Sequence, residues 1–289
     1  MTVKDDLILR AESWAASLWS AALTRWTVRE GQDKSFRQHV VHPVILSVLG
    51  GHFPGKKLRI LDLGCGDGIL LEDQRVAELM EDGGAYLGID SSEKLITHAR
   101  NRHTAVRDCF LRGNLSDPSL TEVILSRGSA WDCAMSVFVI QEMPDIMPLL
   151  NTLSNVLPPG ALAVFVTVHP EFAQWLAGEG RMKKEENLEG DAGLSEIRWR
   201  WAGYYPIVDE PLEAFYLPYF HRSVDDYGNL LSKSGFVTEK IMEFPDKSCD
   251  LPRLIKDGIS PFVPFPANLY WPRIVEEPST LAIIARKEG

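Results

Sequence analysis

The sequence predicts an α/β protein built on a parallel, doubly wound sheet. Between Leu58 and Val168, apolar runs rich in strand-forming residues alternate with segments of helical periodicity, which is the order of βαβ units. The run Ala161–Val168 is apolar and typical of a strand that is buried on both faces. A sheet of this kind carries helices on both sides and binds its ligands at the carboxyl ends of its strands.

Two helices are expected before the first strand. Over residues 6–26, leucine and tryptophan recur at near-helical spacing and predict an amphipathic helix. A second helix is expected over residues 35–50, with Pro43 as a point of interruption or kinking and Gly50–Gly51 as its end. We expect residues 1–52 to form a helical cover over the core.

The core is expected over residues 53–170 as an alternation of strands and helices. Asp82–Gly83–Gly84 ends its first helix, and Leu157–Pro158–Pro159–Gly160 ends its last. Ser91 is expected to cap the helix that follows the second strand. The strands are expected at Leu58–Leu63, Ala85–Ile89, Cys109–Arg112, Trp131–Val139 and Ala161–Val168, and the helices at Ile69–Glu81, from Ser91, and at Asp145–Val156.

The alternation stops at His169–Pro170, and residues 171–222 are expected to form an inserted lid. Within this aromatic and charged segment, Trp199 and Trp201 alternate with arginines, as in a strand with one apolar and one basic face. The run Arg181–Glu186 is expected to be the solvated face of a helix. Residues 223–289 are expected to complete the core sheet, with a helix at Ser223–Lys233 and strands at Val237–Met242 and Ser279–Ala285.

Composition and charge narrow the possible functions. The chain has 289 residues, of which 45% are hydrophobic and 24% are charged, as in ordinary soluble globular proteins. Its formal net charge is −10, whereas proteins that hold phosphate backbones carry basic surfaces, so a nucleic-acid partner is not expected. No apolar run reaches the roughly 18–20 residues that span a bilayer, and the first residues lack a signal-peptide pattern. We therefore expect a cytoplasmic protein without a membrane partner.

The cysteines and histidines do not predict a metal site. Four cysteines are scattered through the chain without a Cys-x-x-Cys pair, and they are expected to be reduced thiols. The seven histidines are also scattered, and no cluster of cysteines or carboxylates joins them. No metal is therefore expected.

A glycine turn and a distal acid predict an adenosine site. Gly64, Gly66 and Gly68 follow the first strand at alternate positions, and a helix-compatible segment begins directly after them. Such a turn lets a nucleotide-like ligand lie against bare backbone. Asp90 ends the second predicted strand, where a carboxylate can accept hydrogen bonds from both hydroxyls of a ribose.

The chemistry of the turn favours a sulfonium cofactor over a dinucleotide. The spacing is Gly-x-Gly-x-Gly rather than the Gly-x-Gly-x-x-Gly of dinucleotide sites. Asp62 precedes the turn and Asp67 lies within it. Carboxylates would repel a pyrophosphate, but they attract a ligand that carries an ammonium and a sulfonium.

These residues resemble the first motif of the class I S-adenosylmethionine-dependent methyltransferases, small-molecule branch. The resemblance continues through Phe110–Leu115, which is similar to the third motif, and Trp131–Glu142, which is similar to the fourth. Phe220–Tyr227 and Ser234–Gly235–Phe236 resemble the region around the sixth strand of small-molecule members. The resemblance implies a Rossmann-like, doubly wound sheet of seven strands, with the last strand antiparallel, and S-adenosyl-L-methionine as cofactor.

The resemblance also implies which residues contact the cofactor. Asp90 matches the ribose-binding acid of the family, and Asn114 stands where an aspartate commonly lies beside adenine. An amide oxygen can still accept a hydrogen bond from the adenine amino group. Arg37 is expected to hold the methionine carboxylate. The expected cofactor-binding residues are Asp62, Gly64, Cys65, Gly66, Asp90, Ser91, Asn114, Leu115, Phe138 and Arg37.

Transfer of a sulfonium methyl requires little activation of the donor. The protein must align the acceptor, exclude water and, for a hydroxyl or amine acceptor, remove a proton. The base is expected beyond the carboxyl ends of the strands Trp131–Val139 and Ala161–Val168. Each candidate also has a plain structural interpretation, as a helix cap or a turn residue. The candidates are Glu142, His169, Glu171 and His221, with Gln141 and Glu142 standing where family members often have histidines.

The inserted lid is expected to supply the acceptor site. Its aromatic residues predict either a small satellite core or a pocket for a hydrophobic or aromatic small molecule. Its arginines suit an anionic group on that molecule, such as a phenolic acid, a polyketide or an isoprenoid phosphate. The expected substrate-binding residues are Trp175, Arg198, Trp199, Arg200, Trp201, Tyr204 and Arg222.

Several alternatives remain open at this point. The chain can be an RNA or protein methyltransferase, which would keep the cofactor and change the partner, although its acidic charge argues against RNA. An NAD-dependent oxidoreductase is the alternative of another class, against which the glycine spacing argues. A cofactor-binding protein without activity is a further alternative. The atom that is methylated and the oligomeric state, monomer or homodimer, stay undecided.

Overall fold

The computed structural model describes residues 37–80, 83–173, 219–245, 250, 253, 256 and 278–289, with backbone alone for residues 182–186, 196–203 and 215–218. The helix expected over residues 6–26 lies outside this part of the chain. In the described part, no helix is long and apolar enough to cross a membrane.

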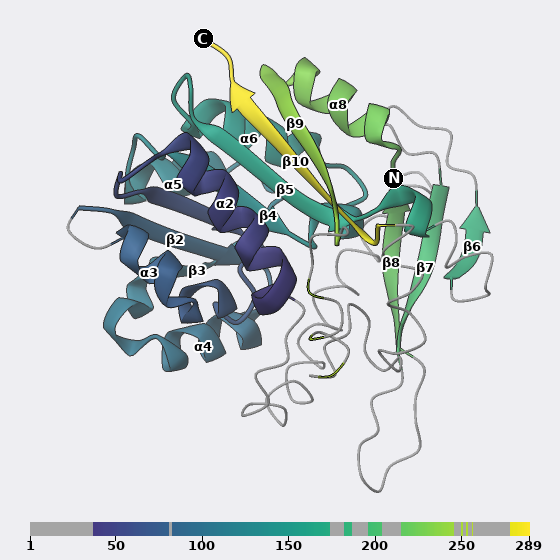
Figure 1. The fold of residues 1–289 in the computed structure, drawn as a ribbon, viewed down its shortest axis with the longest axis horizontal. Coiled ribbons are helices and arrows are strands. Elements are labelled where there is room, and N and C mark those ends of the chain that lie inside the picture. The colour runs from purple at the N-terminus through teal and green to yellow at the C-terminus, as the bar shows by residue number, and fades with distance from the viewer. Residues whose placement is uncertain are drawn as a thin grey trace, which may run out of the picture.

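The main sheet has seven strands in the order β3-β2-β1-β4-β5-β10-β9 (Figure 1). Its first five strands are parallel, and β10 runs antiparallel to both β5 and β9. The predicted fold class, including the antiparallel last strand, is confirmed. The strands are β1 (Arg59–Leu63), β2 (Ala85–Asp90), β3 (Phe110–Arg112), β4 (Cys133–Val137), β5 (Leu162–Val168), β9 (Phe236–Phe244) and β10 (Thr280–Lys287).

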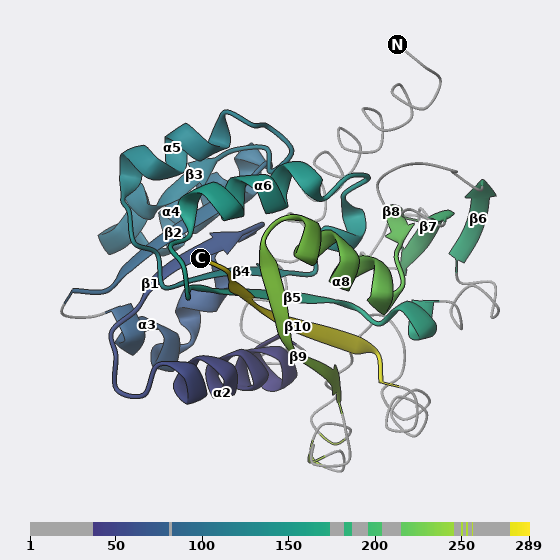
Figure 2. The ribbon, with the colours of Figure 1, turned by 90° about the horizontal axis from the view of Figure 1, so that it is seen from above.

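Helices cover both faces of this sheet and form two cores, one on each face (Figure 2). The alternation of side chains along each strand divides them between the cores, so that Leu162 and Val164 pack on one face and Ala163 and Phe165 on the other. One core includes α2 (His42–His52), α3 (Gln74–Met80) and α4 (Glu93–Arg102), and the other includes α5 (Leu120–Arg127), α6 (Met147–Val156) and α8 (Val224–Lys233).

The structure corrects two helix starts. Pro43 occupies the first turn of α2 and opens that helix instead of interrupting it, because the first turn does not need its missing N–H. Ser92, and not Ser91, caps α4, since its Oγ accepts a hydrogen bond from the Leu95 N–H at 3.3 Å.

Helix α5 has no counterpart among the predicted elements. Leu120 and Ile124 are buried on one side of it, while Val123 and Leu125 are 41% and 46% exposed on another. Because apolar residues lie on several sides of this helix, they do not recur at a clear helical spacing. The sequence alone therefore did not identify the segment as a helix.

A second, three-stranded antiparallel sheet lies beside the main one (Figures 1 and 2). It contains β6 (Met182–Glu186), β7 (Glu196–Gly203) and β8 (Phe215–His221). The expected strand around Trp199 and Trp201 is present as β7. The expectation of a helix at Arg181–Glu186 is wrong, because β6 pairs its backbone with β7.

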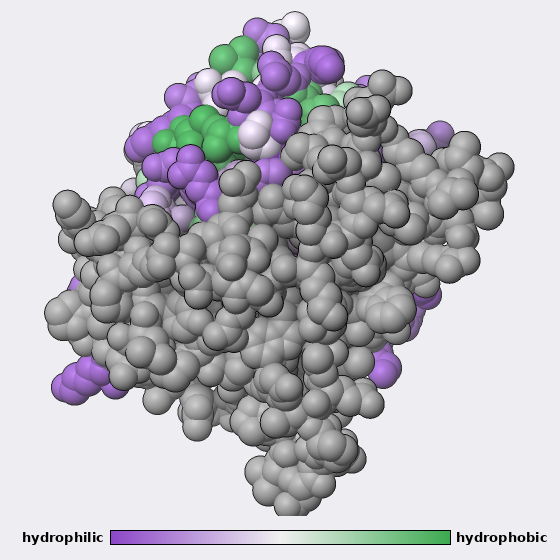
Figure 3. All heavy atoms as spheres, turned by 90° about the vertical axis from the view of Figure 1, so that its right-hand side faces the viewer, coloured by the Kyte–Doolittle hydropathy of each residue, from purple (hydrophilic) through white to green (hydrophobic). Residues whose placement is uncertain are grey.

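Helix α8 forms part of the outer surface of the molecule. The predicted helix begins with a capping box, in which Ser223 and Asp226 each accept a hydrogen bond from the other's backbone. In Figure 3, the described atoms at the top of the molecule, the end where α8 lies in Figure 1, are mostly hydrophilic with hydrophobic groups between them. Such interspersed apolar groups are normal for a protein surface.

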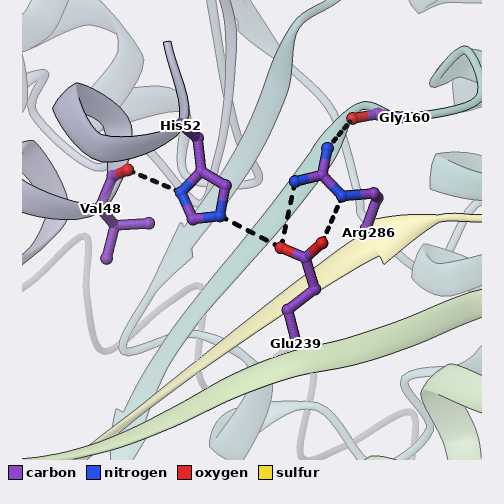
Figure 4. Close-up of polar contacts among 5 residues, drawn as sticks. All are labelled: Val48, His52, Gly160, Glu239 and Arg286. Carbon is purple, nitrogen blue, oxygen red and sulfur yellow. Dashed lines mark hydrogen bonds and ion pairs between the residues drawn. The ribbon is translucent and has the colours of Figure 1, made fainter. Parts of the chain in front are cut away.

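At the amino end of the parallel strands, polar contacts join α2 to β9 and β10 (Figure 4). His52 Nε2 lies 3.1 Å from Glu239 Oε2, and Glu239 pairs with Arg286. Arg286 Nη1 also donates to Gly160 O at 2.7 Å. These contacts lie at the opposite end of the sheet from the glycine turn.

Candidate active site

The glycine turn follows β1 and is fixed to the end of β2. The N–H groups of Gly64 and Cys65 both donate to Ile89 O, at 2.7 and 3.1 Å. Gly64 has φ +80°, and a Cβ there would lie 2.2 Å from Val139 Cγ2. Only glycine therefore suits this position, because both the backbone conformation and the close approach of Val139 exclude a side chain.

The middle of the turn presents bare backbone. Gly66 has φ +58°, and a Cβ there would meet no atom within 4 Å. The end of α4 contacts the turn, because His103 Nε2 lies 3.0 Å from Gly68 O. Gly66 thus lies at an open position on a supported turn, which is what close approach of a flat ligand to backbone requires.

Asp90 lies at the end of β2, directly beside this turn. Its Oδ2 accepts a hydrogen bond from the Gly66 N–H at 3.0 Å, and its Oδ1 accepts one from the Ser92 N–H at 2.9 Å. Burial raises the pKa of Asp90, and the two backbone N–H groups oppose that shift. A carboxylate has about four acceptor positions, so both oxygens can still accept from ribose hydroxyls.

Asp62 lies deeper, within β1. It is 4% exposed, and its Oδ2 accepts a hydrogen bond from the Tyr86 hydroxyl at 2.6 Å. Burial raises the pKa of Asp62 to about 6, while Tyr86 and Arg37 act in the opposite direction. Tyr86 is not among the site residues that the sequence predicts. The available signal was its place in the second strand, two positions before Gly88, which is the register partner of Asp62.

Arg37 and Phe138 meet at the same end of the sheet. The Arg37 guanidinium lies 5.8 Å from the centre of the Phe138 ring, and its positive charge lowers the pKa values of both Asp62 and Asp90. Phe138 has φ +57°, which is uncommon for a non-glycine residue and typical of functional positions. One cation and two carboxylates therefore surround the turn.

Asp67 has a different role from the one expected. Its Oδ2 lies 3.0 Å from Arg102 Nη1, and the same nitrogen lies 3.1 Å from Glu72 Oε1. The charge of Asp67 is therefore compensated within the protein. Of the two acids in and before the turn, Asp62 keeps the less compensated charge.

The remaining predicted cofactor residues lie near the turn and β3. Cys65 is buried, and burial raises the pKa of its thiol well above the ordinary value. Ser91 is exposed beside Asp90, and Leu115 is buried. Asn114 is exposed, but its Oδ1 already accepts from the Ser116 N–H at 3.0 Å. An adenine amino group would have to share that oxygen.

His169 and Glu171 follow β5. Both ring nitrogens of His169 are engaged: Nδ1 accepts from the Glu171 N–H at 3.2 Å, and Nε2 lies 3.1 Å from Glu243 Oε1. An Nδ1 that accepts leaves Nε2 as the donor, so this imidazole has no lone pair left for an acceptor's proton. The Glu171 side chain is exposed.

The other predicted bases are buried next to the end of β8. Glu142 is 9% exposed within the turn η5 (Ile140–Glu142), and His221 is 6% exposed at the last position of β8. Gln141 Oε1 accepts from the Thr167 hydroxyl at 3.0 Å, which directs that amide oxygen toward β5. The structure thus brings β8 and η5 together, with Glu142 and His221 in the interior.

Arg222 is directed toward the protein itself. It is fully buried, and its Nη2 donates to Met143 O and Pro144 O at 2.9 and 2.8 Å. Its Nη1 donates to Ile140 O at 3.3 Å. These contacts favour a role in holding the loop after β4 over a role in binding an anionic acceptor.

The other expected acceptor residues are described in part or not at all. Arg198, Trp199, Arg200 and Trp201 lie in β7, where the backbone alone is described, and Trp175 and Tyr204 lie outside the described residues. In the part of the chain with described side chains, no group of three or more His, Cys, Asp or Glu residues could hold a metal ion.

With this geometry in view, comparison with known proteins decides the family. A family model described as "Methyltransferase domain" matches residues 34–240, which is more than half of the chain. The chain belongs to this methyltransferase family. The matched range begins before Arg37 and includes the glycine turn, Asp90 and Arg222.

Curated relatives are similar over a part of their length. A ubiquinone biosynthesis O-methyltransferase of Coxiella burnetii is 25% identical over 138 residues, which is 48% of this chain and 55% of that protein. One of Sinorhizobium fredii is 31% identical over 170 residues, which is 56% of this chain and 60% of that protein. The matches therefore span less than two thirds of each relative.

A solved structure has a similar fold over almost the whole chain. Magnesium protoporphyrin IX methyltransferase from Synechocystis PCC 6803, with bound S-adenosylhomocysteine, has a TM-score of 0.54 at 14% identity. The match covers 95% of this chain and 98% of that one, and at this identity it concerns the fold. The predictions of the methyltransferase family and of its fold are confirmed.

The raised pKa of Asp62 predicts a pH-dependent stability. The folded protein keeps this proton up to a pH of about 6, whereas an ordinary aspartate, as in the unfolded chain, has a pKa of 3.8. Between these two pH values the folded state binds more protons than the unfolded state, so the free energy of unfolding falls as the pH rises. The loss is complete about one pH unit above 6, where it reaches about 3 kcal/mol. Urea unfolding at pH 4.5 and pH 7.5 should show Asp62→Asn gaining stability over the wild type chiefly at pH 7.5. An equal effect at both pH values would contradict this.

Proposed function

We propose that this chain transfers the methyl group of S-adenosylmethionine to an oxygen of a hydrophobic or aromatic small molecule. The observation that carries the proposal is the arrangement at the carboxyl end of the sheet. There, the open backbone of Gly66 lies beside the anchored carboxylate of Asp90, and Asp62 and Arg37 supply opposite charges. This arrangement complements a ligand with a ribose, an ammonium and a carboxylate.

The residues present fit the cofactor. Asp90 would accept from the ribose hydroxyls, and Gly64 and Gly66 would allow the ligand to approach their backbone. The buried carboxylate of Asp62 suits the cationic part, and Arg37 suits the carboxylate of the methionine end. When bound, the cofactor supplies an electrophilic methyl group. Everything else required is positioning, exclusion of water and removal of one proton, and these are tasks of the protein.

The proposal of an oxygen acceptor is supported by the relatives named ubiquinone biosynthesis O-methyltransferases. An aromatic hydroxyl must lose its proton during transfer, so a base is required nearby. Of the four predicted bases, His169 has both ring nitrogens engaged, and Glu142 and His221 are buried. Glu171 follows β5 at the carboxyl end of the sheet with an exposed side chain, and we assign the proton to its carboxylate.

The test combines binding and turnover. Isothermal titration should show S-adenosylhomocysteine binding to the full chain, and radiolabelled S-adenosylmethionine should label a member of a panel of catechols, hydroxybenzoates and polyprenylated phenols. With that acceptor, Glu171→Gln should lower kcat by about 100-fold or more without changing cofactor affinity. Absence of cofactor binding would refute the proposal, and labelling of amines or RNA alone would refute the oxygen acceptor.

A further inference from the structure

The guanidinium of Arg222 is buried at the point where the second sheet returns to the core. It directly follows β8, and its Nη2 donates to the carbonyl oxygens of Met143 and Pro144 at 2.9 and 2.8 Å. Its Nη1 donates to Ile140 O at 3.3 Å. One side chain therefore binds three carbonyl oxygens of the loop that follows β4.

Arg222 supplies donors to the carbonyl groups of a buried loop. Met143 and Pro144 directly follow the short 3₁₀ turn η5, and Ile140 O, at the start of that turn, also accepts a hydrogen bond from the Met143 N–H at 3.4 Å. Because the loop is buried, unpaired carbonyl oxygens would be costly there. The planar guanidinium donates from two nitrogens at once, whereas a lysine ammonium donates from one point and cannot span the same set.

The same loop also contacts the cofactor turn. Val139 stands directly before η5, and its Cγ2 lies 2.2 Å from the position that a Cβ on Gly64 would take. Phe138, one residue earlier, holds φ +57° and lies under Arg37. Residues 138–144 therefore touch the glycine turn at one end and Arg222 at the other.

We propose that Arg222 is a positioning residue that couples the second sheet to the cofactor turn through residues 138–144. The inference rests on the proposed function, because it takes the glycine turn as the cofactor site. A ligand that reduces the mobility of the turn also reduces that of Val139 and η5. Because Arg222 binds this loop and directly follows β8, the mobility of β8 falls as well. Strand β8 pairs with β7, with His221 opposite Glu196, so the reduced mobility extends to β7. Cofactor binding thereby orders the sheet that carries the expected acceptor residues.

Hydrogen exchange measured by mass spectrometry tests this coupling in the full chain. The samples are the wild type, Arg222→Lys and the matched control Arg286→Lys, each with and without saturating S-adenosylhomocysteine. Arg286 binds Glu239 and Gly160 O at the other end of the sheet, so its replacement leaves the loop untouched. The ligand should slow exchange of Glu196–Gly203 and Phe215–His221 by about threefold or more in the wild type and the control.

In Arg222→Lys this slowing should disappear although the ligand still binds, with an affinity lowered by about 3- to 10-fold. If Arg222→Lys does not fold, Val139→Ala takes its place, because it breaks the same connection at the turn and leaves Arg222 intact. If the ligand slows exchange in the variant as much as in the wild type, the coupling is overturned. The coupling is also overturned if the wild type binds the ligand and exchange in β7 and β8 is not slowed. Failure of the wild type to bind S-adenosylhomocysteine is a separate result that refutes the proposed function.

Discussion

Asp90→Ala is expected to weaken S-adenosylhomocysteine binding by about 100-fold or more. The carboxylate would accept from two ribose hydroxyls, and each hydrogen bond to a charged group contributes about 1.5–3 kcal/mol. Two such bonds correspond to about 3 kcal/mol, which is a factor of roughly 100 in affinity. The variant also loses the two bonds that place the N–H groups of Gly66 and Ser92. Isothermal titration at constant pH measures the change.

A nearby acid provides the control for this substitution. Glu93 is exposed in the first turn of α4 and pairs with Arg112 at 3.0 Å on the surface. Exposed pairs contribute little, so Glu93→Ala should bind the ligand within about twofold of the wild type. Equal affinities of Asp90→Ala and Glu93→Ala would show that Asp90 does not hold the ribose.

Gly64→Ala is expected to lower the free energy of unfolding by about 3 kcal/mol or more. The new Cβ would lie 2.2 Å from Val139 Cγ2, in a backbone conformation with φ +80°. The left-handed conformation costs roughly 1–2 kcal/mol for alanine, and overpacking adds about 1–3 kcal/mol. Urea unfolding followed by circular dichroism measures the loss.

Gly66→Ala is the matched comparison, two residues further along the turn. It also has a positive φ, of +58°, but a Cβ there would enter open space. Its loss of stability should therefore be about 1–2 kcal/mol, from the backbone alone. Its cofactor affinity should fall sharply, because the added methyl group would lie where the ligand approaches. The two variants should thus separate folding from binding, and a reversed order of stability would contradict this account of the turn.

Local patterns were sufficient to predict the main sheet. The apolar runs before the glycine turn, before Asp90 and at Ala161–Val168 each became a parallel strand of the sheet, within one or two residues of the expected bounds. These strands are central and pack on both faces, so their composition identifies them without knowledge of their neighbours. The place of the turn and of Asp90 at one edge follows from the same topology.

Properties that depend on distant partners could not be predicted in this way. Asp67 looked like a free carboxylate until the structure placed Arg102 beside it. Arg222 looked available for an anion, because nothing in the local sequence indicates that three carbonyl oxygens of another loop surround it. The strand β6 looked helical, since its strand conformation depends on pairing with β7.

The length of helix α4 is constrained by contacts at both of its ends. It begins at Ser92, next to Asp90, and at its other end Arg102 and His103 contact Asp67 and Gly68. Its ten residues span about 15 Å, and these contacts fix both of its ends next to the glycine turn and Asp90. One inserted residue would rotate Arg102 and His103 by about 100° away from the turn. A redesign of this protein should therefore preserve the length of α4.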